Sequence, residues 1–261
     1  MTRRTRAQRL TAISLTGGAV LSLLAAPPAL AGDAESTGNS SSTDHSQTLT
    51  ATPGSDPTVA DVGGGTSNSG VAAANTGAVG GEGITVEPGD AHSAGNESSS
   101  RLDQSTRSSA SGGGISVFRQ RAFILNGGAA VADTGFSAGG GITTGNAWAL
   151  GNSSRTSVSQ WAVTDDTDGA LRLIDQRIAV ANLGAAVAET GFNVGDSIET
   201  GDATATGDIA DTTATQGGVV TGAPTGPVIV RQRDDTLNAG AGAANTGHDE
   251  TAGDDSTNDP E

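Results

Sequence analysis

The sequence predicts an all-β repeat protein, and the simplest form of it is a narrow β-solenoid, or β-helix, with units of about 56 residues. One motif, N-x-G-x-[AG]-x-A-x-T-G, recurs with spacings of 58, 56 and 56 residues. Within each copy the recurring positions alternate with variable ones, and a period of two indicates extended chain. Only 34% of the residues are apolar, six are aromatic and 40 are glycine, so a core of large side chains is excluded. The motif begins at Asn68, Asn126, Asn182 and Asn238.

Residues 1–31 have the features of a secretory signal peptide. Four arginines precede an apolar run, and the run leads to the small-residue site Ala29-Leu30-Ala31. A membrane anchor is the alternative, but Thr, Ser and Gly interrupt the run. We therefore expect cleavage before Gly32 and a protein that is secreted or associated with the cell surface.

The repeats divide the chain after the signal peptide. We expect the acidic C-terminal segment to be disordered, because it lacks apolar residues to bury. The predicted divisions are a partial N-terminal repeat at 32–67, unit 1 at 68–125, unit 2 at 126–181, unit 3 at 182–237, a truncated repeat at 238–247 and the tail at 248–261.

A second motif divides each unit further. It begins sixteen residues after the first three asparagines, at Ile84, Ile142 and Ile198. Glycines that directly follow threonine predict turns with positive φ between short strands. Each unit then makes about three coils of 18 to 19 residues, and about twelve rungs give a rod of roughly 60 Å. These turn glycines are Gly135, Gly145, Gly191, Gly201 and Gly247.

Asparagine and glutamine recur at matched positions, which predicts inward-facing polar ladders. Stacked amides can hydrogen-bond to the copies above and below them. One ladder contains the four motif asparagines named above. Two others contain Gln104, Gln160 and Gln216, and Gln120, Gln176 and Gln232.

Alternation alone leaves other folds open, namely an antiparallel array of hairpins, or a disordered chain with a recurring sequence. The Gln and Asn spacing is similar, at the level of repeat logic, to curlin-type amyloid subunits and to β-helical bacterial adhesins. The order of residues departs from the short curlin unit, so no functional residue is transferred from that family.

Composition excludes several kinds of chemistry. The chain has no cysteine, which excludes disulfides and thiolate metal sites. Without the four arginines of the signal peptide, nine basic residues face 29 acidic ones, a net charge of −20 that disfavours nucleic acid as a partner. His45, His92 and His248 occupy three different repeat frames, so neither a catalytic triad nor a metal cluster is expected. We expect no cofactor; weak binding of divalent cations to the acidic surface stays open.

Aromatic residues occur only between positions 118 and 192. Phe136 and Phe192 hold the same frame, and Trp148 and Trp161 lie between them in the sequence. These four side chains either fill the central core or form a contact patch for a ligand or partner. Asn39, Asn96 and Asn152 open Asn-x-Ser sequons in one repeat frame, where a structural asparagine is the competing interpretation.

The function we expect is that of a secreted, non-catalytic structural or adhesive protein of the bacterial cell surface or extracellular matrix. Its expected partners are other copies of the chain or a glycan of the envelope or matrix. Two alternatives stay open: a curlin-like self-assembling fibre subunit, and a flat β-face with rows of threonine, near Thr204 and Thr206, that binds ice or polysaccharide. A polysaccharide-lyase activity is disfavoured, because it needs clustered carboxylates and aromatic platforms.

Overall fold

The protein is an all-β molecule in which long parallel strands stack into sheets. The structure is a computed structural model, and it describes residues 11–18, 32–51, 58–77, 80, 83–110, 115–166, 171–222, 226–247 and 250–251. None of these residues forms a helix, so this part of the chain has no helical segment that could cross a membrane. The strands are β1 Thr11–Gly18, β2 Ala34–Ala51, β3 Thr58–Asn75, β4 Thr85–Val86, β5 Ala91–Ala110, β6 Ile115–Asp133, β7 Ala138–Thr143, β8 Ala147–Asp166, β9 Leu171–Glu189, β10 Val194–Glu199, β11 Ala203–Thr221, β12 Val228–Asn245 and β13 Glu250–Thr251.

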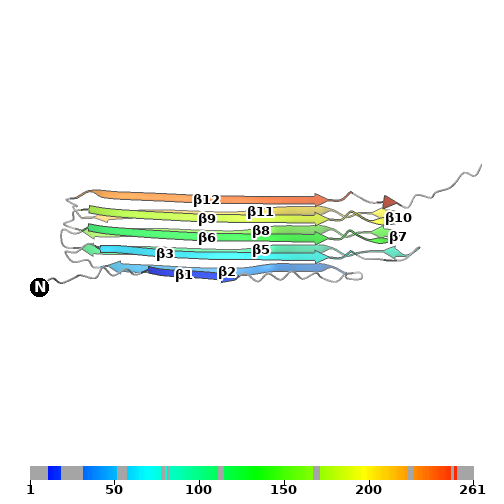
Figure 1. The fold of residues 1–261 in the computed structure, drawn as a ribbon, viewed down its shortest axis with the longest axis horizontal. Helices are drawn as coiled ribbons and strands as arrows, with labels where there is room; N and C mark the ends of the chain where they lie inside the picture. Colours follow the sequence, from blue (N-terminus) through cyan, green and yellow to red (C-terminus); the bar gives the residue numbers. More distant parts are fainter. Residues whose placement is uncertain are drawn as a thin grey trace, which may run out of the picture.

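The described strands form three sheets. Sheet A has the order β1-β3-β6-β9-β12, sheet B has the order β11-β8-β5-β2, and the small sheet C has the order β13-β10-β7-β4. The chain passes from sheet A through sheet C to sheet B and then returns to sheet A one strand further along (Figure 1). All pairings are parallel. Repeated strands that stack in parallel confirm the predicted β-solenoid class.

One coil of the solenoid contains a whole repeat, so the predicted division into three short coils is wrong. Asn126 pairs with Asn182, and Asn182 pairs with Asn238, each 56 residues further along the chain. The long strands contain 18 to 20 residues, and the five predicted turn glycines all lie in the connections between strands. At about 3.3 Å per residue such a strand spans roughly 60 Å. The long dimension therefore follows the strands and not the stacking axis (Figure 1).

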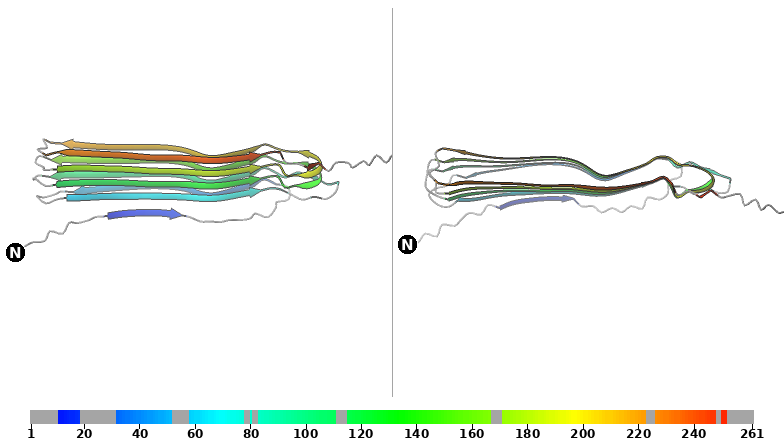
Figure 2. Two further views of the ribbon diagram at one scale, coloured as in Figure 1. Left: turned by 45° about the horizontal axis from the view of Figure 1, so that its top comes forward. Right: turned by 90° about the horizontal axis from the view of Figure 1, so that it is seen from above.

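Sheets A and B pack face to face, with sheet C closing one end (Figure 2). Along β6 and β9, buried and more exposed residues alternate, as expected for strands with one covered face. Alanines pack near sheet C, and two clusters of larger apolar side chains lie further along the interior, so the composition did not exclude large core residues. The larger clusters comprise Leu102, Ala122, Ile124, Val158, Ile178 and Val180, and Ala60, Phe118, Ala162 and Ile174.

Aligned glycines bring the two layers into backbone contact at a place that we call the glycine waist. A Cβ atom added to Gly128 would overlap the carbonyl oxygen of Gly151 in the opposite sheet. The layers draw together there in the right-hand view of Figure 2. The waist comprises Gly70, Gly128, Gly184 and Gly240 in sheet A and Gly38, Gly95, Gly151 and Gly207 in sheet B.

The turns after sheet A differ from the sequence prediction. Positive φ occurs at Phe136 and Phe192, at 56° and 64°, and not at the preceding Gly135 and Gly191. A Cβ atom on Gly135 would overlap the backbone of Gly191 in the next coil. These glycines therefore permit close stacking of successive turns. The left-handed residues are phenylalanines, whose rings stack at a centroid distance of 5.1 Å.

The second motif also pairs differently. Val86, not Ile84, pairs with Ile142, which pairs in turn with Ile198. Val86 is buried whereas Ile84 is exposed. The two extra residues of the first unit therefore precede Val86.

Parts of both chain ends are described. β1 lies within the predicted signal peptide and pairs with β3. Glu250 and Thr251 of the tail predicted to be disordered form β13 and pair with β10. The remainder of both segments lies outside the described residues.

Candidate functional site

The interior of the solenoid holds a continuous column of asparagines in sheet A. Each Nδ2 donates to the Oδ1 of the next asparagine, at 2.8, 2.8 and 2.7 Å. Asn126 also donates to Thr156 Oγ1 and accepts from Ser98 Oγ in sheet B. Its amide thus makes four hydrogen bonds in a site with no solvent exposure. The column comprises Asn68, Asn126, Asn182 and Asn238.

A second asparagine column lies in sheet B. Its Nδ2-to-Oδ1 distances are 2.7, 2.6 and 2.6 Å, and its last member is a carboxylate. The sequence signal was the shared frame of the three sequons. Asn96 and Asn152 have no solvent exposure, so the folded protein cannot carry a glycan on them. The column comprises Asn39, Asn96, Asn152 and Asp208.

The glutamine columns run in the opposite direction. Each Nε2 donates toward the N-terminal coil, at 2.7 to 3.0 Å. Gln104 and Gln160 also donate to backbone carbonyls of sheet A and so join the two layers. The two ends of the solenoid therefore differ in the donors and acceptors that they present. The columns are Gln47, Gln104, Gln160 and Gln216, and Gln120, Gln176 and Gln232.

The four predicted patch residues do not come together. Phe136 and Phe192 stack on each other in the turns between sheets A and C. Trp148 lies 6.0 Å from the ring of His92. Trp161 lies on the same strand as Trp148 but thirteen residues further on, about 40 Å at the usual rise. The aromatics form separate local contacts.

No threonine row is present at the positions that suggested a flat binding face. Thr204 pairs with Trp148, which pairs with His92, which pairs with Glu35. A column of such different side chains cannot offer a regular array of hydroxyls.

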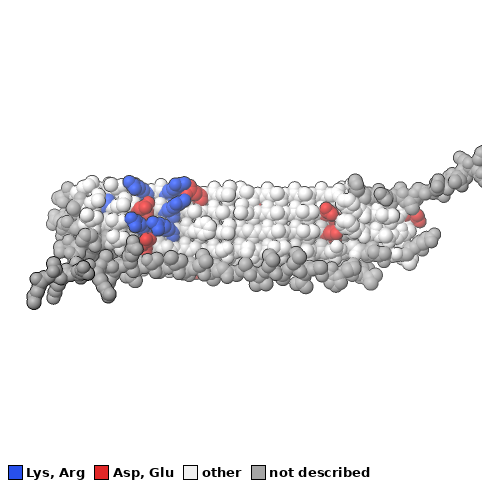
Figure 3. Space-filling view, viewed as in Figure 1, with Lys and Arg blue, Asp and Glu red and all other residues white. Residues whose placement is uncertain are grey.

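The outer face of sheet A carries a group of arginines and acidic residues, visible as the blue and red cluster in Figure 3. Arg177 and Arg233 both contact Asp235, at 3.4 and 2.7 Å. A register column through this group alternates in charge: Asp61, Arg119, Asp175 and Arg231. Opposite charges on neighbouring strands favour this register.

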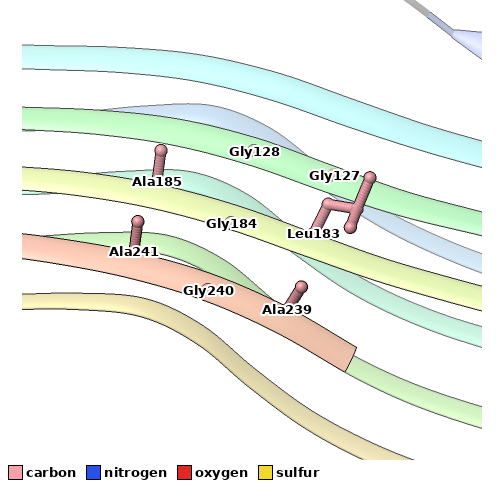
Figure 4. A pocket seen from close by; sticks show the side chains of 8 residues that line it. All are labelled: Gly127, Gly128, Leu183, Gly184, Ala185, Ala239, Gly240 and Ala241. Atoms are coloured by element: carbon pink, nitrogen blue, oxygen red, sulfur yellow. The ribbon is translucent and has the colours of Figure 1, made fainter. Parts of the chain in front are cut away.

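The outer face of sheet A also has a depression of about 430 Å³. Figure 4 shows that it lies over the glycine waist and is walled by small side chains and Leu183. It contains no ionisable residue. Within the described residues there is likewise no group of three or more His, Asp or Glu side chains that could hold a metal ion. His45 and His92 lie at different positions along the strands of sheet B, and His248 lies outside the described residues.

Asp133 is the acidic group whose environment is most distinctive. Burial raises the pKa of its carboxyl above the ordinary value of 3.8, the hydrogen bond from the Gly135 amide lowers it, and the charge of Glu189 raises it. Because the net shift is upward, the folded state holds this proton more tightly than the unfolded state.

We expect this shift to make stability depend on pH. The free energy of unfolding should fall as the pH rises from 3.8 through the raised pKa of Asp133. Asp133→Asn keeps an acceptor for the Gly135 amide and cannot ionise, so this component should vanish. Urea unfolding of both proteins between pH 3.5 and 7 measures it, with Asp211→Asn, on an exposed side chain, as the control. Parallel pH profiles for the wild type and Asp133→Asn would contradict the assignment.

Comparison with known proteins gives no relative from which a function can be transferred. No protein-family model matches the sequence, and no curated protein or solved structure matches it either.

Proposed function

We propose that the chain is an exported, non-catalytic structural protein that acts as a rigid scaffold or adhesive element at the cell surface or in the extracellular matrix. The observation that carries the proposal is the use of the interior amides. Asparagine and glutamine side chains hydrogen-bond along continuous columns from coil to coil. Because these hydrogen bonds join successive coils, we expect the interior to give the solenoid a fixed shape and rigidity.

The outer surface supports the same proposal. Several of its charged groups pair across neighbouring strands, and the depression over the glycine waist is lined by Gly, Ala and Leu residues. A glycan-cleaving enzyme would instead need a groove in which carboxylates and aromatic platforms converge. The broken column at Thr204 disfavours an ice-binding face.

Export and scaffolding can be tested together in the source organism. We expect the chain to be recovered outside the cell, beginning at Gly32, with a β circular dichroism spectrum and an elongated hydrodynamic shape. A deletion strain should lose surface attachment or matrix stiffness, and the wild-type gene should restore it. Asn126→Asp, which breaks the central column, should not restore it. Retention of the chain inside the cell, or turnover of a panel of glycans by the purified protein, would refute the proposal.

A further inference from the structure

The two ends of the solenoid are open sheet edges of matching size. Leaving β1 aside, sheets A and B each contain four long strands, because the coils begin with β2 and end with β12. We propose that copies of the chain stack head to tail, with β11 and β12 of one copy pairing with β2 and β3 of the next. This inference rests on the scaffold function proposed above and names its partner as a second copy of the same chain.

The outer charge column supports this register. It runs Asp61, Arg119, Asp175 and Arg231, so it begins with an acid and ends with a base. Extending the register by one coil places Arg231 beside Asp61 of the next copy. The alternation then continues without a like-charge contact, and opposite charges on neighbouring strands are stabilising.

The inner columns also continue across the junction. Asn238 accepts from Asn182, and among the described residues its own Nδ2 has no acceptor. Asn126 and Asn182 show what a further coil supplies, since each donates to the next asparagine and to a threonine of sheet B. In the next copy the corresponding residues are Asn68 and Thr43.

Glutamine completes the pattern in sheet B. Gln216 donates to Gln160, which leaves its Oε1 facing the end of the solenoid. At the other end of this column, Nε2 of Gln104 donates to Oε1 of Gln47 in the preceding coil. By the same geometry, Nε2 of Gln47 in the next copy can donate to Gln216.

Each end of the solenoid has a titratable residue at an inward position that holds an uncharged residue in the other coils. Asp234 aligns with Ile178, Ala122 and Gly64 in sheet A. His45 aligns with Leu102 in sheet B, and its Nε2 is buried without a hydrogen-bond partner. A single inward carboxylate at a sheet edge would normally oppose pairing.

Stacking brings these two residues together. A Cβ atom on Gly64 of β3 would lie 3.1 Å from Cδ1 of Leu102. Leu102 belongs to β5, the sheet B strand of the next coil. The same relation places Asp234 against His45 of the next copy. In the junction the unpartnered Nε2 of His45 gains an acceptor, and the Asp234 carboxylate, which already accepts from Thr236 Oγ1, gains a second donor.

One position opposes stacking. Asp208 ends the asparagine column of sheet B and accepts from Asn152. In a stack, the second carboxylate oxygen of Asp208 would face Oδ1 of Asn39 in the next copy. In the earlier coils an asparagine Nδ2 occupies the place of that second oxygen and donates to Oδ1 of the following coil. The carboxylate therefore weakens the junction, and Asp208→Asn should strengthen it.

The N-terminal strand covers part of the same edge. β1 pairs with β3 from Asp61 to Asn68, so stacking requires β1 to leave. Removal of residues 1–31 keeps every described pairing except this one. We therefore expect the full chain to stay monomeric and the chain from Gly32 to associate.

Charge exchange tests the junction in the chain from Gly32, with the association constant measured by sedimentation velocity. Asp234→Lys places a lysine against His45, and His45→Asp places a carboxylate against Asp234, so each should weaken association at least tenfold. The double variant restores a complementary pair and should associate within about threefold of the wild type. Asp103→Lys, an equal charge change on the outer face of β5, which lies away from both ends, should have no effect.

Asp208→Asn should strengthen association at least tenfold in the same assay, and circular dichroism should show unchanged strand content. An association constant unchanged or lowered by this variant would contradict the opposition assigned to Asp208.

Cross-linking gives a second measurement that does not depend on position 45. Ser67→Cys and Leu237→Cys lie in one outer column and would be neighbours only across the junction, at a separation that suits a disulfide. A mixture of the two single variants should give heterodimers, and neither variant alone should do so. Ile229→Cys, eight residues along β12, replaces Leu237→Cys as the mismatched control.

The outcomes separate the two proposals. A β-rich, elongated chain that stays monomeric, or single charge variants that associate like the wild type, would overturn the junction while leaving the scaffold function standing. Cross-links in the Ile229→Cys mixture equal to those with Leu237→Cys would overturn the register. A chain from Gly32 without β structure would overturn both proposals.

Discussion

Replacing Asn126 by Asp is expected to destabilise the folded protein by about 3–5 kcal/mol, because it leaves a charge without adequate partners in the interior. The native amide donates to Thr156 and Asn182 and accepts from Asn68 and Ser98. Aspartate keeps the accepting half of this set and loses both donors. Its second oxygen would then face Asn182 Oδ1.

Asn238→Asp is the matched control for this substitution. It makes the same chemical change in the same column, but at the exposed last coil, where Nδ2 has no acceptor among the described residues. We expect Asn238→Asp to leave the urea midpoint of the monomer nearly unchanged. Equal midpoints for the two variants would show that the column contributes little to stability.

Gly128→Ala is expected to destabilise the fold by about 3 kcal/mol or more, at the upper end of overpacking effects. The added methyl group would overlap the carbonyl oxygen of Gly151. Because that atom is backbone, relief requires the two sheets to move apart at the waist. The stacked glycines of adjacent coils would then lose their close approach as well.

The adjacent glycine supplies the control for this prediction. A Cβ atom on Gly127 meets only Leu183 O, at 3.7 Å, which is an ordinary contact. Gly127→Ala should therefore leave the thermal midpoint unchanged or raise it, since alanine loses less backbone entropy than glycine on folding. Similar losses in both variants would exclude the waist as the cause.

The solenoid class could be predicted because inward-facing residues alternate with outward-facing ones, and this alternation can be recognised in the sequence. Asparagine and glutamine recur there at fixed distances, and each repeat copy serves as a comparison for the others. Coil size was less accessible, because the spacing of turns does not show whether a turn completes a coil or only leads from one sheet to the next. Gly128 and Gly151 are required by a contact between sheets, and that contact joins segments distant in the sequence.

The residues at the two ends of the solenoid were also difficult to interpret from the sequence alone. Asp234 and Asp208 resemble ordinary acidic residues in the sequence, and only the register reveals that they occupy interior columns. His45 likewise gains significance from its alignment with Leu102 and Val158. The aromatic residues could be placed in the repeat frame. The separation of Trp148 and Trp161 by thirteen positions could be converted into a distance only once both were known to lie on one strand.

The one-repeat coil has a consequence for how the chain folds. Each long strand pairs with a strand about 56 residues away, and the described strands include no hairpin that could form first. Loop closure on this scale must precede any stabilising pairing, so nucleation should be slow. Once two coils exist, their edge is a template for the next. Refolding should therefore show a slow first phase followed by rapid growth, and a preformed edge should abolish the delay.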